Sequence, residues 1–451
     1  MERAIWWIRR DLRLADNQAL TEAIKYSKEV VPVFILDPYF ENNRRSCEKR
    51  TAFLYTGLHR LDEDLKERGS RLIIRRGYPQ AVLKQLTSEL NVGGIFAEAD
   101  NSLYARERDA TIADAIPLRL AGSPSFRHPG DVVKGDGAPY TVYTPYMRAW
   151  RRLVLPKRSD LLPAPNHINT PENIVSGILP DVATMGDIYF RAGEGEANRR
   201  LELFTEGLSV GIFQYAEQRD RMDLDGTSRL SPYLRFGMLS ARKAVVAALE
   251  AAQLAIDNHA ERGSETWLNE LIWREFYISI YYHFPEISSQ SFRAGLRTIA
   301  WRNDPDEFEA WKCGATGYPV VDAGMRELAA SGWMHNRARM ITASFLVKDL
   351  LVDWRWGERF FMQHLLDGDP AANNGGWQWT AGVGTDAAPY FRVFNPILQA
   401  ARFDPDGAYV RRWVPELARV PLRYIHQPWT MPADEQRRAG CVIGKDYPAP
   451  I

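Results

Sequence analysis

The segment Asp367–Thr380, DGDPAANNGGWQWT, combines carboxylates, adjacent asparagines, paired glycines and two tryptophans over a short stretch. Gly375 and Gly376 weaken any regular element in which they lie. The amides of Asn373 and Asn374 must find hydrogen-bond partners if they are buried. A packed core has no need of this combination, so the segment indicates a ligand site.

The two tryptophans of this segment are Trp377 and Trp379. In a helix they face nearly opposite ways, and in an extended strand they share a face. In either case one can line a cavity while the other enters the core. A flat, flipped-out nucleobase would fit between stacking and hydrogen-bonding side chains, and the candidates for such a cavity are Trp273, Trp379, Met340, Glu270 and Asn336.

A second candidate segment is TWLNELIWREFY. As a helix it places Glu270 within one turn of Trp267, Trp273 and Arg274, so that a carboxylate lies beside an indole. The alternative interpretation is an ordinary ion pair between Glu270 and Arg274 beside core tryptophans. For this segment alone, the ion pair is the favoured interpretation, because such pairs are common and usually contribute little.

The segment GWMHNRARMI brings Asn336, Arg339 and Met340 together on one turn, with His335 next to them. Met340 as a core residue and His335 as a buried imidazole are the alternatives. The loop GTSRLSPY, over 226–233, offers hydroxyls, an arginine and backbone amides ahead of a helix, which suits a diphosphate. A serine-rich helix cap is the commoner use of such a loop.

The elements that must position these residues change in kind along the chain. Apolar runs such as AIWWI, VVPVFIL and RLIIR alternate with segments of helical period, which predicts an α/β domain over 1–130 with a doubly wound parallel sheet. An interdomain linker follows over 131–190, where the chain becomes proline-rich. Residues 191–451 repeat apolar residues at three and four, which predicts an all-α domain.

The composition limits the classes of function that the chain can have. Lysine plus arginine and aspartate plus glutamate both number 57, so any contact with DNA must come from a local patch of basic residues. The three cysteines lie far apart without a C-x-x-C pair, which argues against a disulfide framework or a metal site. The chain shows neither a signal-peptide core nor a run long enough to span a bilayer, which predicts a soluble cytoplasmic protein.

Taken together, these segments resemble the photolyase and cryptochrome family, and most closely its class I cyclobutane pyrimidine dimer photolyases. The resemblance extends from WWIRRDLRLADNQAL to the final DYPAPI, over essentially the whole chain. Its most specific parts are GTSRLSPYL, WLNELIWREFY, TGYPVVDAGMREL, GWMHNRARMITASFLVKDLL and DGDPAANNGGWQWTAGVGTDAAPYFRVFNP. It implies an α/β antenna-binding domain, a helical FAD- and DNA-binding domain, and a monomer without an obligate protein partner.

The resemblance implies that FAD lies within the helical domain and is reduced and anionic in the active form. Asp367 would pair with Arg339 beside the isoalloxazine, and Asn373 would meet the ring nitrogen that changes protonation on reduction. Asp369 would face the polar edge of the flavin. The remaining FAD contacts that it implies are Thr227, Ser228, Arg229, Leu230 and Ser231 at the diphosphate, with Tyr215, Trp267 and Arg274 nearby.

The implied reaction is the light-driven opening of pyrimidine dimers in damaged DNA, without net redox change. Glu270 and Asn336 would bind the dimer through hydrogen bonds. The side chains of Trp273, Trp379 and Met340 would line the cavity around it. Arg219, Arg337 and Arg392 would contact phosphates. A chain of oxidisable indoles would photoreduce the flavin, and its members would be Trp301, Trp354 and Trp377.

Two rivals within the family remain. A photolyase for (6-4) photoproducts would carry histidines where this chain has Asn336 and Met340. A cryptochrome, which signals rather than repairs, usually shows a C-terminal extension or an altered cavity. A non-catalytic helical scaffold with an aromatic core is a third reading, and it would leave the purified protein colourless.

The family also implies a light-harvesting antenna in the N-terminal domain. Folate-binding members carry an Asn-Glu pair where this chain has Tyr104 and Ala105, so methenyltetrahydrofolate is disfavoured. An 8-hydroxy-5-deazaflavin is the favoured antenna. Its expected contacts are Phe34, Asp37, Arg50, Asp100 and Arg235, each of which also has an ordinary structural explanation.

Overall fold

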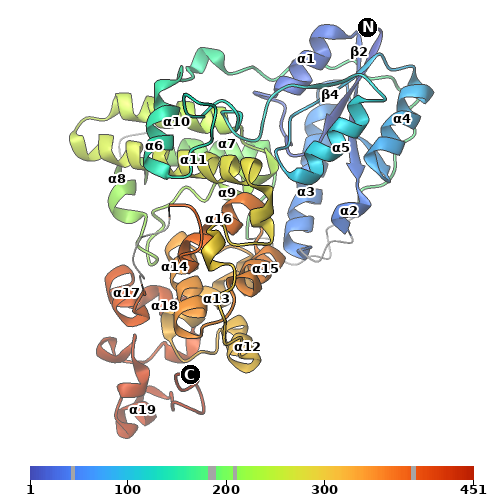
Figure 1. Cartoon of the computed structure of the whole chain (residues 1–451). Helices are drawn as coiled ribbons and strands as arrows, with labels where there is room; N and C mark the ends of the chain where they lie inside the picture. Colours follow the sequence, from blue (N-terminus) through green and yellow to red (C-terminus); the bar gives the residue numbers. More distant parts are fainter. Residues whose placement is uncertain (42–45, 181–188, 207–210, 387–392) are drawn as a thin grey trace. The chain divides into compact units, whose positions relative to one another are not determined.

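The computed structural model describes residues 1–41, 46–180, 189–206, 211–386 and 393–451. They form two compact units, whose elements are labelled in Figure 1. The first unit comprises Met1–Phe213 and Ser228–Pro285, and the second comprises Gln214–Thr227 and Glu286–Ile451. The domain boundaries expected from the sequence, 1–130, 131–190 and 191–451, stay a prediction.

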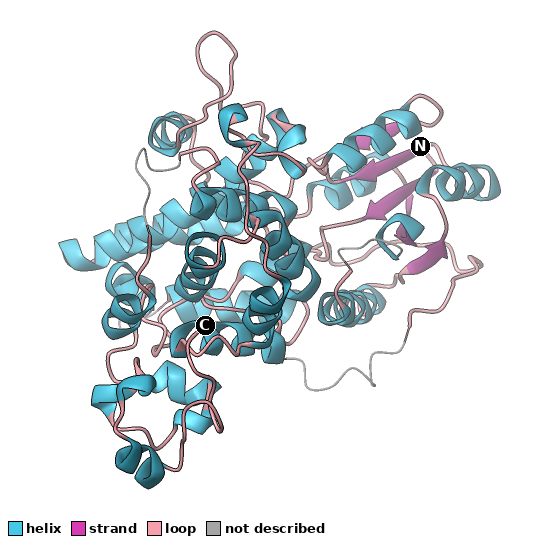
Figure 2. Cartoon of the chain, turned by 60° about the horizontal axis from the view of Figure 1, so that its bottom comes forward, coloured by secondary structure: helices cyan, strands magenta, loops and turns pink. Residues whose placement is uncertain are grey.

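The first unit contains a parallel five-stranded sheet with the order β3-β2-β1-β4-β5, which confirms the predicted fold class. The strands β1, β2 and β4 are buried on both faces, as the continuous apolar runs require. The backbone register of β1 on β2 runs from Arg3 opposite Glu29 to Ile8 opposite Phe34. Helices pack around the sheet (Figure 2). The strands are β1 (Arg3–Ile8), β2 (Glu29–Leu36), β3 (Ile73–Arg76), β4 (Gly94–Ala97) and β5 (Leu118–Leu120).

The helices of the α/β part connect these strands. The neighbours of β1 in the sheet are β2 and β4, so the strand order changes direction there and the crossovers place helices on both faces. These helices are α1 (Gln18–Tyr26), α2 (Pro38–Glu41), α3 (Glu48–Lys66), α4 (Pro79–Leu90) and α5 (Leu103–Ala113).

Further helices complete the first unit, except that α8 belongs to the second unit from Gln214 onward. The side chain of Asp257 caps α11 by accepting a hydrogen bond from Ala260 N. The helices are α6 (Tyr143–Arg152), α7 (Glu194–Thr205), α8 (Gly211–Gln218), α9 (Ser231–Phe236), α10 (Ala241–Leu254) and α11 (Asn258–His283).

A close approach ties α9 to the segment after β1. Gly237 follows α9 with φ +63°, and a Cβ at this position would come within 1.8 Å of Arg10 O, so only glycine fits. Arg13 donates to Gly237 O at 3.0 Å and pairs with the buried Glu98. These contacts hold the helical part of the first unit against the end of the sheet.

The second unit is helical and is built around one large apolar core. None of the helices in the described ranges is long and apolar enough to cross a membrane. Its helices are α12 (Pro305–Cys313), α13 (Pro319–Ser331), α14 (Asn336–Ser344), α15 (Trp354–His364), α16 (Pro370–Ala381), α17 (Pro396–Phe403), α18 (Ala408–Trp413) and α19 (Ala433–Ala439), with a π-helical turn over Phe345–Asp349.

Candidate active site

The segment rich in amides and tryptophans forms α16. Asp369 caps the helix, because its Oδ1 accepts from Ala371 N at 3.0 Å and from Ala372 N at 3.3 Å. Trp377 is only 3% exposed and belongs to the core of the second unit, whereas Trp379 lines a cavity. The helical geometry therefore sends the two indoles to different places, as expected.

The two adjacent asparagines have different surroundings. Asn374 is 1% exposed and donates to Ile287 O at 2.9 Å, while its own Oδ1 accepts from Gln378 Nε2 at 3.0 Å. Asn373 donates through Nδ2 to Glu358 O at 2.9 Å, which directs its Oδ1 away from that carbonyl. Asn374 is thus a structural residue, and Asn373 presents an oriented amide.

The ion pair expected between Arg339 and Asp367 is present, with Nη2 2.8 Å from Oδ2. Arg339 also donates through Nε to Met334 O at 2.8 Å. The other carboxylate oxygen of Asp367, Oδ1, is buried and has no hydrogen-bond partner within the described ranges. A buried acceptor of this kind needs a donor, which an N–H or O–H group of a bound cofactor would provide.

His335 caps α14 by accepting from Arg337 N through Nδ1 at 3.1 Å. Its imidazole is 4% exposed, in line with the buried alternative. Asn336 opens the helix and is exposed. Arg337 forms an ion pair with Asp220, with 2.7 Å between Nη2 and Oδ2, and its guanidinium lies 4.4 Å above the Phe403 ring. The carboxylate therefore partly neutralises the charge of this arginine.

A cavity of about 530 Å³ in the second unit contains three of the expected substrate contacts. They are Arg337, Met340 and Trp379. The Nε of Arg337 and the Oε1 of Gln399 are buried without a hydrogen-bond partner among described residues. Local patterns carry no signal for the other lining residues, because these lie on segments distant along the chain: Asp220, Val393, Phe394, Gln399, Arg402 and Phe403.

The Glu270 segment forms the middle of α11 in the first unit. Trp267 is 3% exposed and packs against Phe204 with 5.3 Å between ring centroids. Arg274 donates to Pro124 O at 2.8 Å and to Leu234 O at 3.3 Å, so backbone carbonyls accept hydrogen bonds from two of its guanidinium nitrogens. Glu270 is partly exposed.

Trp273 is partly exposed and stacks face to face on Tyr143 of α6. The ring centroids are 3.6 Å apart and the rings are nearly parallel, at 6°. Sequence reasoning missed Tyr143, because a residue 130 positions away leaves no trace in the local pattern around Trp273.

Glu275 of α11 is a second residue that sequence reasoning missed. Its carboxylate is 4% exposed and accepts from Trp150 Nε1 at 2.6 Å and from the backbone N–H of Phe126 and Arg127. Burial raises the pKa of Glu275 to about 7, although these donors act in the opposite direction. Glu275 thus ties α6 and the loop before it to the helix that carries Glu270 and Trp273.

The expected diphosphate loop has an unusual backbone. Arg229 has φ +50°, in the left-handed region that side chains other than glycine rarely adopt. Such strain is concentrated at ligand sites. Leu230 is buried, whereas the hydroxyl residues Thr227, Ser228 and Ser231 are at least partly exposed.

Tyr215 and Arg219 lie one turn apart at the end of α8. Tyr215 is 8% exposed, and the guanidinium of Arg219 lies 5.7 Å from the centre of its ring. Arg219 also approaches Asp220 at 3.8 Å. Arg392 lies outside the described residues.

The three tryptophans of the expected electron-transfer chain are gathered in one core. Trp354 is 1% exposed and Trp377 3%, and the partly buried Trp301 packs against the same cluster. Trp377 also contacts Trp311, with 6.2 Å between ring centroids. The cluster therefore contains one partly exposed indole, that of Trp301, packed against a core with two buried ones.

Two of the expected antenna residues lie at or just beyond the carboxyl end of β2. Phe34 belongs to β2, and Asp37 follows that strand and accepts from the hydroxyl of Tyr104 at 2.5 Å. Tyr104 stacks on Tyr39 with 3.7 Å between ring centroids at 3°. Burial and the hydrogen bond to Asp37 raise the pKa of Tyr104.

The remaining antenna candidates are less closely grouped. Burial would raise the pKa of Asp100, but Arg10, at 3.8 Å, and Arg9 outweigh it and lower that pKa. Arg235 accepts from Arg10 Nε through its backbone O at 3.2 Å. Arg50 opens α3 and is partly buried.

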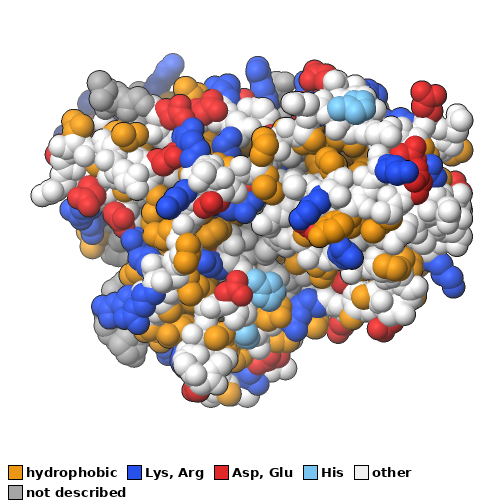
Figure 3. Space-filling view, turned by 90° about the horizontal axis from the view of Figure 1, so that it is seen from above, with side chains coloured by type: hydrophobic (Ala, Val, Ile, Leu, Met, Phe, Trp, Pro, Cys, Tyr) orange, Lys and Arg blue, Asp and Glu red, His pale blue; other side chains and the backbone are white. Residues whose placement is uncertain are grey.

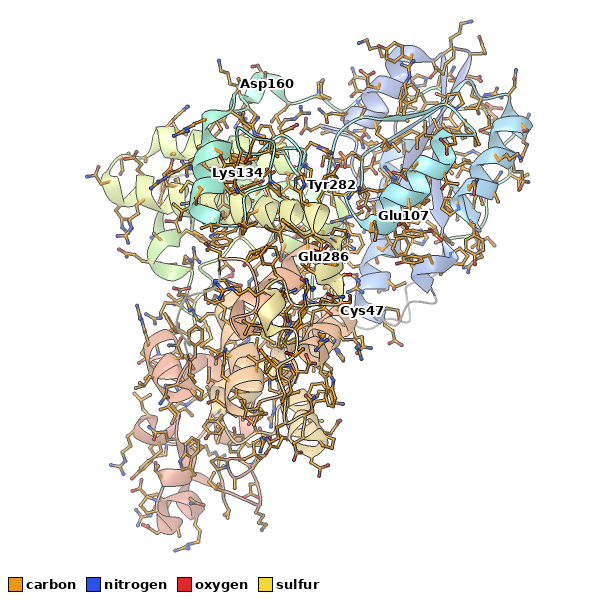
Figure 4. The ribbon with its side chains drawn as sticks, viewed as in Figure 1. Cys47, Glu107, Lys134, Asp160, Tyr282 and Glu286 are labelled. Atoms are coloured by element: carbon orange, nitrogen blue, oxygen red, sulfur yellow. The ribbon has the colours of Figure 1, made fainter. Side chains whose placement is uncertain are left out.

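Positive and negative side chains are interspersed on the face shown in Figure 3, without a single basic field. Tyr282, labelled in Figure 4, lies near the end of α11, and the guanidinium of Arg106 lies 4.1 Å from the centre of its ring. Arg106 also donates to Tyr282 O at 3.0 Å. Its charge therefore serves to join α5 to α11.

Two family models match the chain. The model described as DNA photolyase matches residues 4–166, and the model described as FAD binding domain of DNA photolyase matches residues 267–451. A protein named deoxyribodipyrimidine photo-lyase from Alkalihalophilus pseudofirmus is 39% identical over 99% of this chain and 94% of its own length.

Solved structures show the same similarity. A class III photolyase from Agrobacterium tumefaciens has a TM-score of 0.91 at 34% identity, covering 100% of this chain and 94% of that one. A cryptochrome from Synechocystis has a TM-score of 0.90 at 29% identity, covering 100% of this chain and 96% of that one. The fold is thus shared by proteins with different names.

Proposed function

The chain belongs to the DNA photolyase family, and from this premise we propose that it is a deoxyribodipyrimidine photo-lyase that uses light to repair cyclobutane pyrimidine dimers in DNA. The observation that carries the proposal is the cavity in which an indole, a thioether and an arginine meet. The indole and the thioether suit a flat base, and the arginine suits a neighbouring phosphate.

The chain carries a FAD-binding domain. We assign the isoalloxazine contacts to Arg339, Asp367, Asp369 and Asn373. The orphaned Oδ1 of Asp367 fits a donor on the flavin, and the anchoring of Asn373 Nδ2 on Glu358 O leaves its amide oxygen for a ring N–H. Reduced, anionic FAD held by these residues would supply the electron for the light-driven repair.

The remaining FAD contacts are assigned to the loop with the strained Arg229 and to three aromatic or basic residues. The backbone N–H groups and hydroxyls of such a loop can hold a diphosphate. The assigned residues are Thr227, Ser228, Arg229, Leu230 and Ser231, with Tyr215, Trp267 and Arg274.

The substrate contacts follow from side-chain chemistry. Glu270 and Asn336 hydrogen-bond the dimer and stabilise its added electron, and Met340 packs against it. Trp273 and Trp379 each offer an indole face for stacking. Arg219, Arg337 and Arg392 contact phosphates, so DNA binding depends on local cations rather than on net charge.

Trp301, Trp354 and Trp377 serve to photoreduce oxidised flavin, because each indole can pass an electron inward. They have no part in the repair step itself. The antenna is proposed to be an 8-hydroxy-5-deazaflavin at Phe34, Asp37, Arg50, Asp100 and Arg235, with methenyltetrahydrofolate as the alternative. The flat surface of the Tyr39 and Tyr104 stack beside Asp37 supports a planar aromatic ligand.

Illumination of the purified holoprotein with an oligonucleotide that contains a cyclobutane dimer tests the proposal. We expect loss of dimers under blue light and none in the dark. The same assay with a (6-4) photoproduct should show no repair, because Asn336 and Met340 stand where that class of photolyase carries histidines. Repair of the (6-4) lesion alone would overturn the substrate assignment.

A cryptochrome-type signalling role is the second candidate, and the structural similarity to the Synechocystis cryptochrome favours it. The same illumination assay separates the two. A protein that shows the flavin spectrum and binds dimer-containing DNA but leaves the dimers intact in the light would be a signalling protein.

A further inference from the structure

Trp273 has one of its two indole faces covered within the first unit. Tyr143 lies against it at 3.6 Å and 6°, and two further rings of α11 contact it, Phe276 at 5.6 Å and 81° and Tyr277 at 5.6 Å and 34°. Because the tyrosine takes one face, a base can stack only on the other. The orientation of the indole therefore depends on its aromatic neighbours.

Tyr143 is itself held in place. Its side chain is 8% exposed, and its hydroxyl donates to Asn269 O at 2.9 Å. The same α6 is fastened to α11 further along, where Arg151 donates to Asn269 Oδ1 at 3.1 Å and Trp150 donates to Glu275 Oε2 at 2.6 Å. Tyr143 thus lies on a helix that is hydrogen-bonded to α11 at several points, rather than on a loop.

The Tyr143 hydroxyl also contacts the turn of α11 that carries Glu270, because its acceptor, Asn269 O, belongs to the residue just before Glu270. One tyrosine therefore touches the turn that carries the proposed carboxylate and the ring that is proposed to stack on the dimer. Neither contact requires that Tyr143 meet the substrate.

We propose that Tyr143 is a positioning residue that fixes the plane of Trp273 before damaged DNA binds. This inference rests on the proposed function, because it concerns how the dimer is received. A side chain that is already ordered loses less conformational freedom on binding, which for one side chain is worth about 3- to 10-fold in affinity. Binding of undamaged DNA does not require the stack.

The test compares dissociation constants of the FAD-loaded protein for dimer-containing and undamaged oligonucleotides of the same sequence at fixed salt. Tyr143→Leu should weaken binding of the dimer oligonucleotide about 3- to 10-fold and leave binding of the undamaged one unchanged. Tyr143→Phe keeps the ring on the indole and loses only the hydroxyl, so it should bind the dimer more tightly than Tyr143→Leu does. Equal weakening for both oligonucleotides would show a merely structural role and overturn the inference.

A double-mutant cycle with Trp273→Ala provides the second readout. In the Trp273→Ala background, Tyr143→Leu should cause no further loss, because there is no indole left to position, and additive losses would overturn the inference. If Trp273→Ala weakens binding but Tyr143→Leu does not, this inference fails alone. If Trp273→Ala has no effect, the proposed role of Trp273 fails and this inference fails with it.

Folding is monitored by the flavin absorption spectrum and the melting temperature. If Tyr143→Leu does not retain FAD, Tyr143→His takes its place, since the smaller flat ring covers less of the indole. The dimer affinity of Tyr143→His should then lie below that of the unmodified protein. An unchanged affinity would contradict the proposal.

Discussion

Glu270 lies in the middle of α11, three residues before Trp273 and one turn before Arg274, and is partly exposed. The segment TWLNELIWREFY alone favours an ion pair between Glu270 and Arg274 over a substrate contact. In the structure Arg274 donates to two backbone carbonyls, Pro124 O and Leu234 O, so its position is explained by those contacts. The proposed role of Glu270 then rests on its place beside Trp273 on a partly exposed stretch of α11.

Replacing Glu270 with alanine should lower light-driven repair and leave FAD bound, because the lost hydrogen bond acts on the dimer and not on the cofactor. A hydrogen bond with a charged partner is worth about 1.5–3 kcal/mol, so a loss of about tenfold or more is expected. The measurement is the number of dimers repaired per absorbed photon. Glu270→Gln is the matched control, since its amide can still bond the dimer, and full repair by Glu270→Ala would refute the role.

At the scale of elements, α15 and α16 cross closely because of one glycine. A Cβ on Gly357 would lie 2.1 Å from Cη2 of Trp377 and 2.7 Å from Cδ2 of Leu346. Trp377 is large and buried, so it cannot move aside without disturbing the core of the second unit. The close packing of these two helices also holds Asn373 against Glu358 O.

Gly357→Ala should therefore destabilise the protein by about 1–3 kcal/mol, the usual cost of overpacking. Unfolding in urea, followed by circular dichroism, measures the change. Gly195→Ala is the control, because Gly195 lies in α7 and a Cβ there meets nothing within 4 Å. That substitution should be neutral or stabilising by up to about 1 kcal/mol. Similar effects of both substitutions would contradict the packing argument.

The junction of α6 with α11 should make stability depend on pH. Burial raises the pKa of Glu275 to about 7, above the ordinary value of 4.5. Between these values the folded protein binds more protons at this site than the unfolded chain does, so the contribution of Glu275 is full below about pH 4.5 and is lost as the pH rises to about 7.

Glu275→Gln removes that titration. The melting temperature of the variant should accordingly change less than that of the unmodified protein between pH 4.5 and 7. The variant should also be less stable at pH 5, because an amide cannot satisfy every donor around this site, at a cost of about 1–3 kcal/mol. Parallel pH profiles for the two proteins would show that Glu275 does not titrate in this range.

Local patterns predicted the elements well and their contacts poorly. The apolar runs predicted the parallel sheet, and the spacing around Glu270 predicted a helix, because these signals lie within one element. Around Trp377 the sequence left helix and strand open, and the structure has the helix α16 there. The pairing of Asp367 with Arg339 came from the family resemblance. Tyr143 and Glu275 were missed, since their roles depend on the packing of α6 against α11, which neither segment records.

For the whole molecule, balanced composition does not exclude DNA binding. Acidic and basic residues are equal in number, and the two signs are interspersed on the face in Figure 3. Arg337 pairs with Asp220, and Arg106 is used to join two helices. Three arginines are proposed to contact phosphates, so binding of DNA should show a modest salt dependence.

The molecule is also proposed to perform two light-driven reactions, and they should be separable. Repair needs the reduced flavin and the substrate residues, whereas photoreduction needs an electron route from the surface. Trp301 is the partly exposed member of the proposed route, and Trp354 and Trp377 are buried in the core against which it packs. A substitution at Trp301 therefore acts on one reaction and spares the other.

Trp301→Phe should block photoreduction of oxidised flavin, because phenylalanine is much harder to oxidise than tryptophan. Repair should be unchanged when the flavin is chemically reduced beforehand. Flavin absorption under blue light measures the first reaction, and loss of dimers measures the second. Trp413→Phe is the control, since Trp413 packs against the same core but is not part of the proposed route. If Trp301→Phe leaves photoreduction intact, electrons reach the flavin by another route, and Trp311, which contacts Trp377 at 6.2 Å, is the first residue to substitute next.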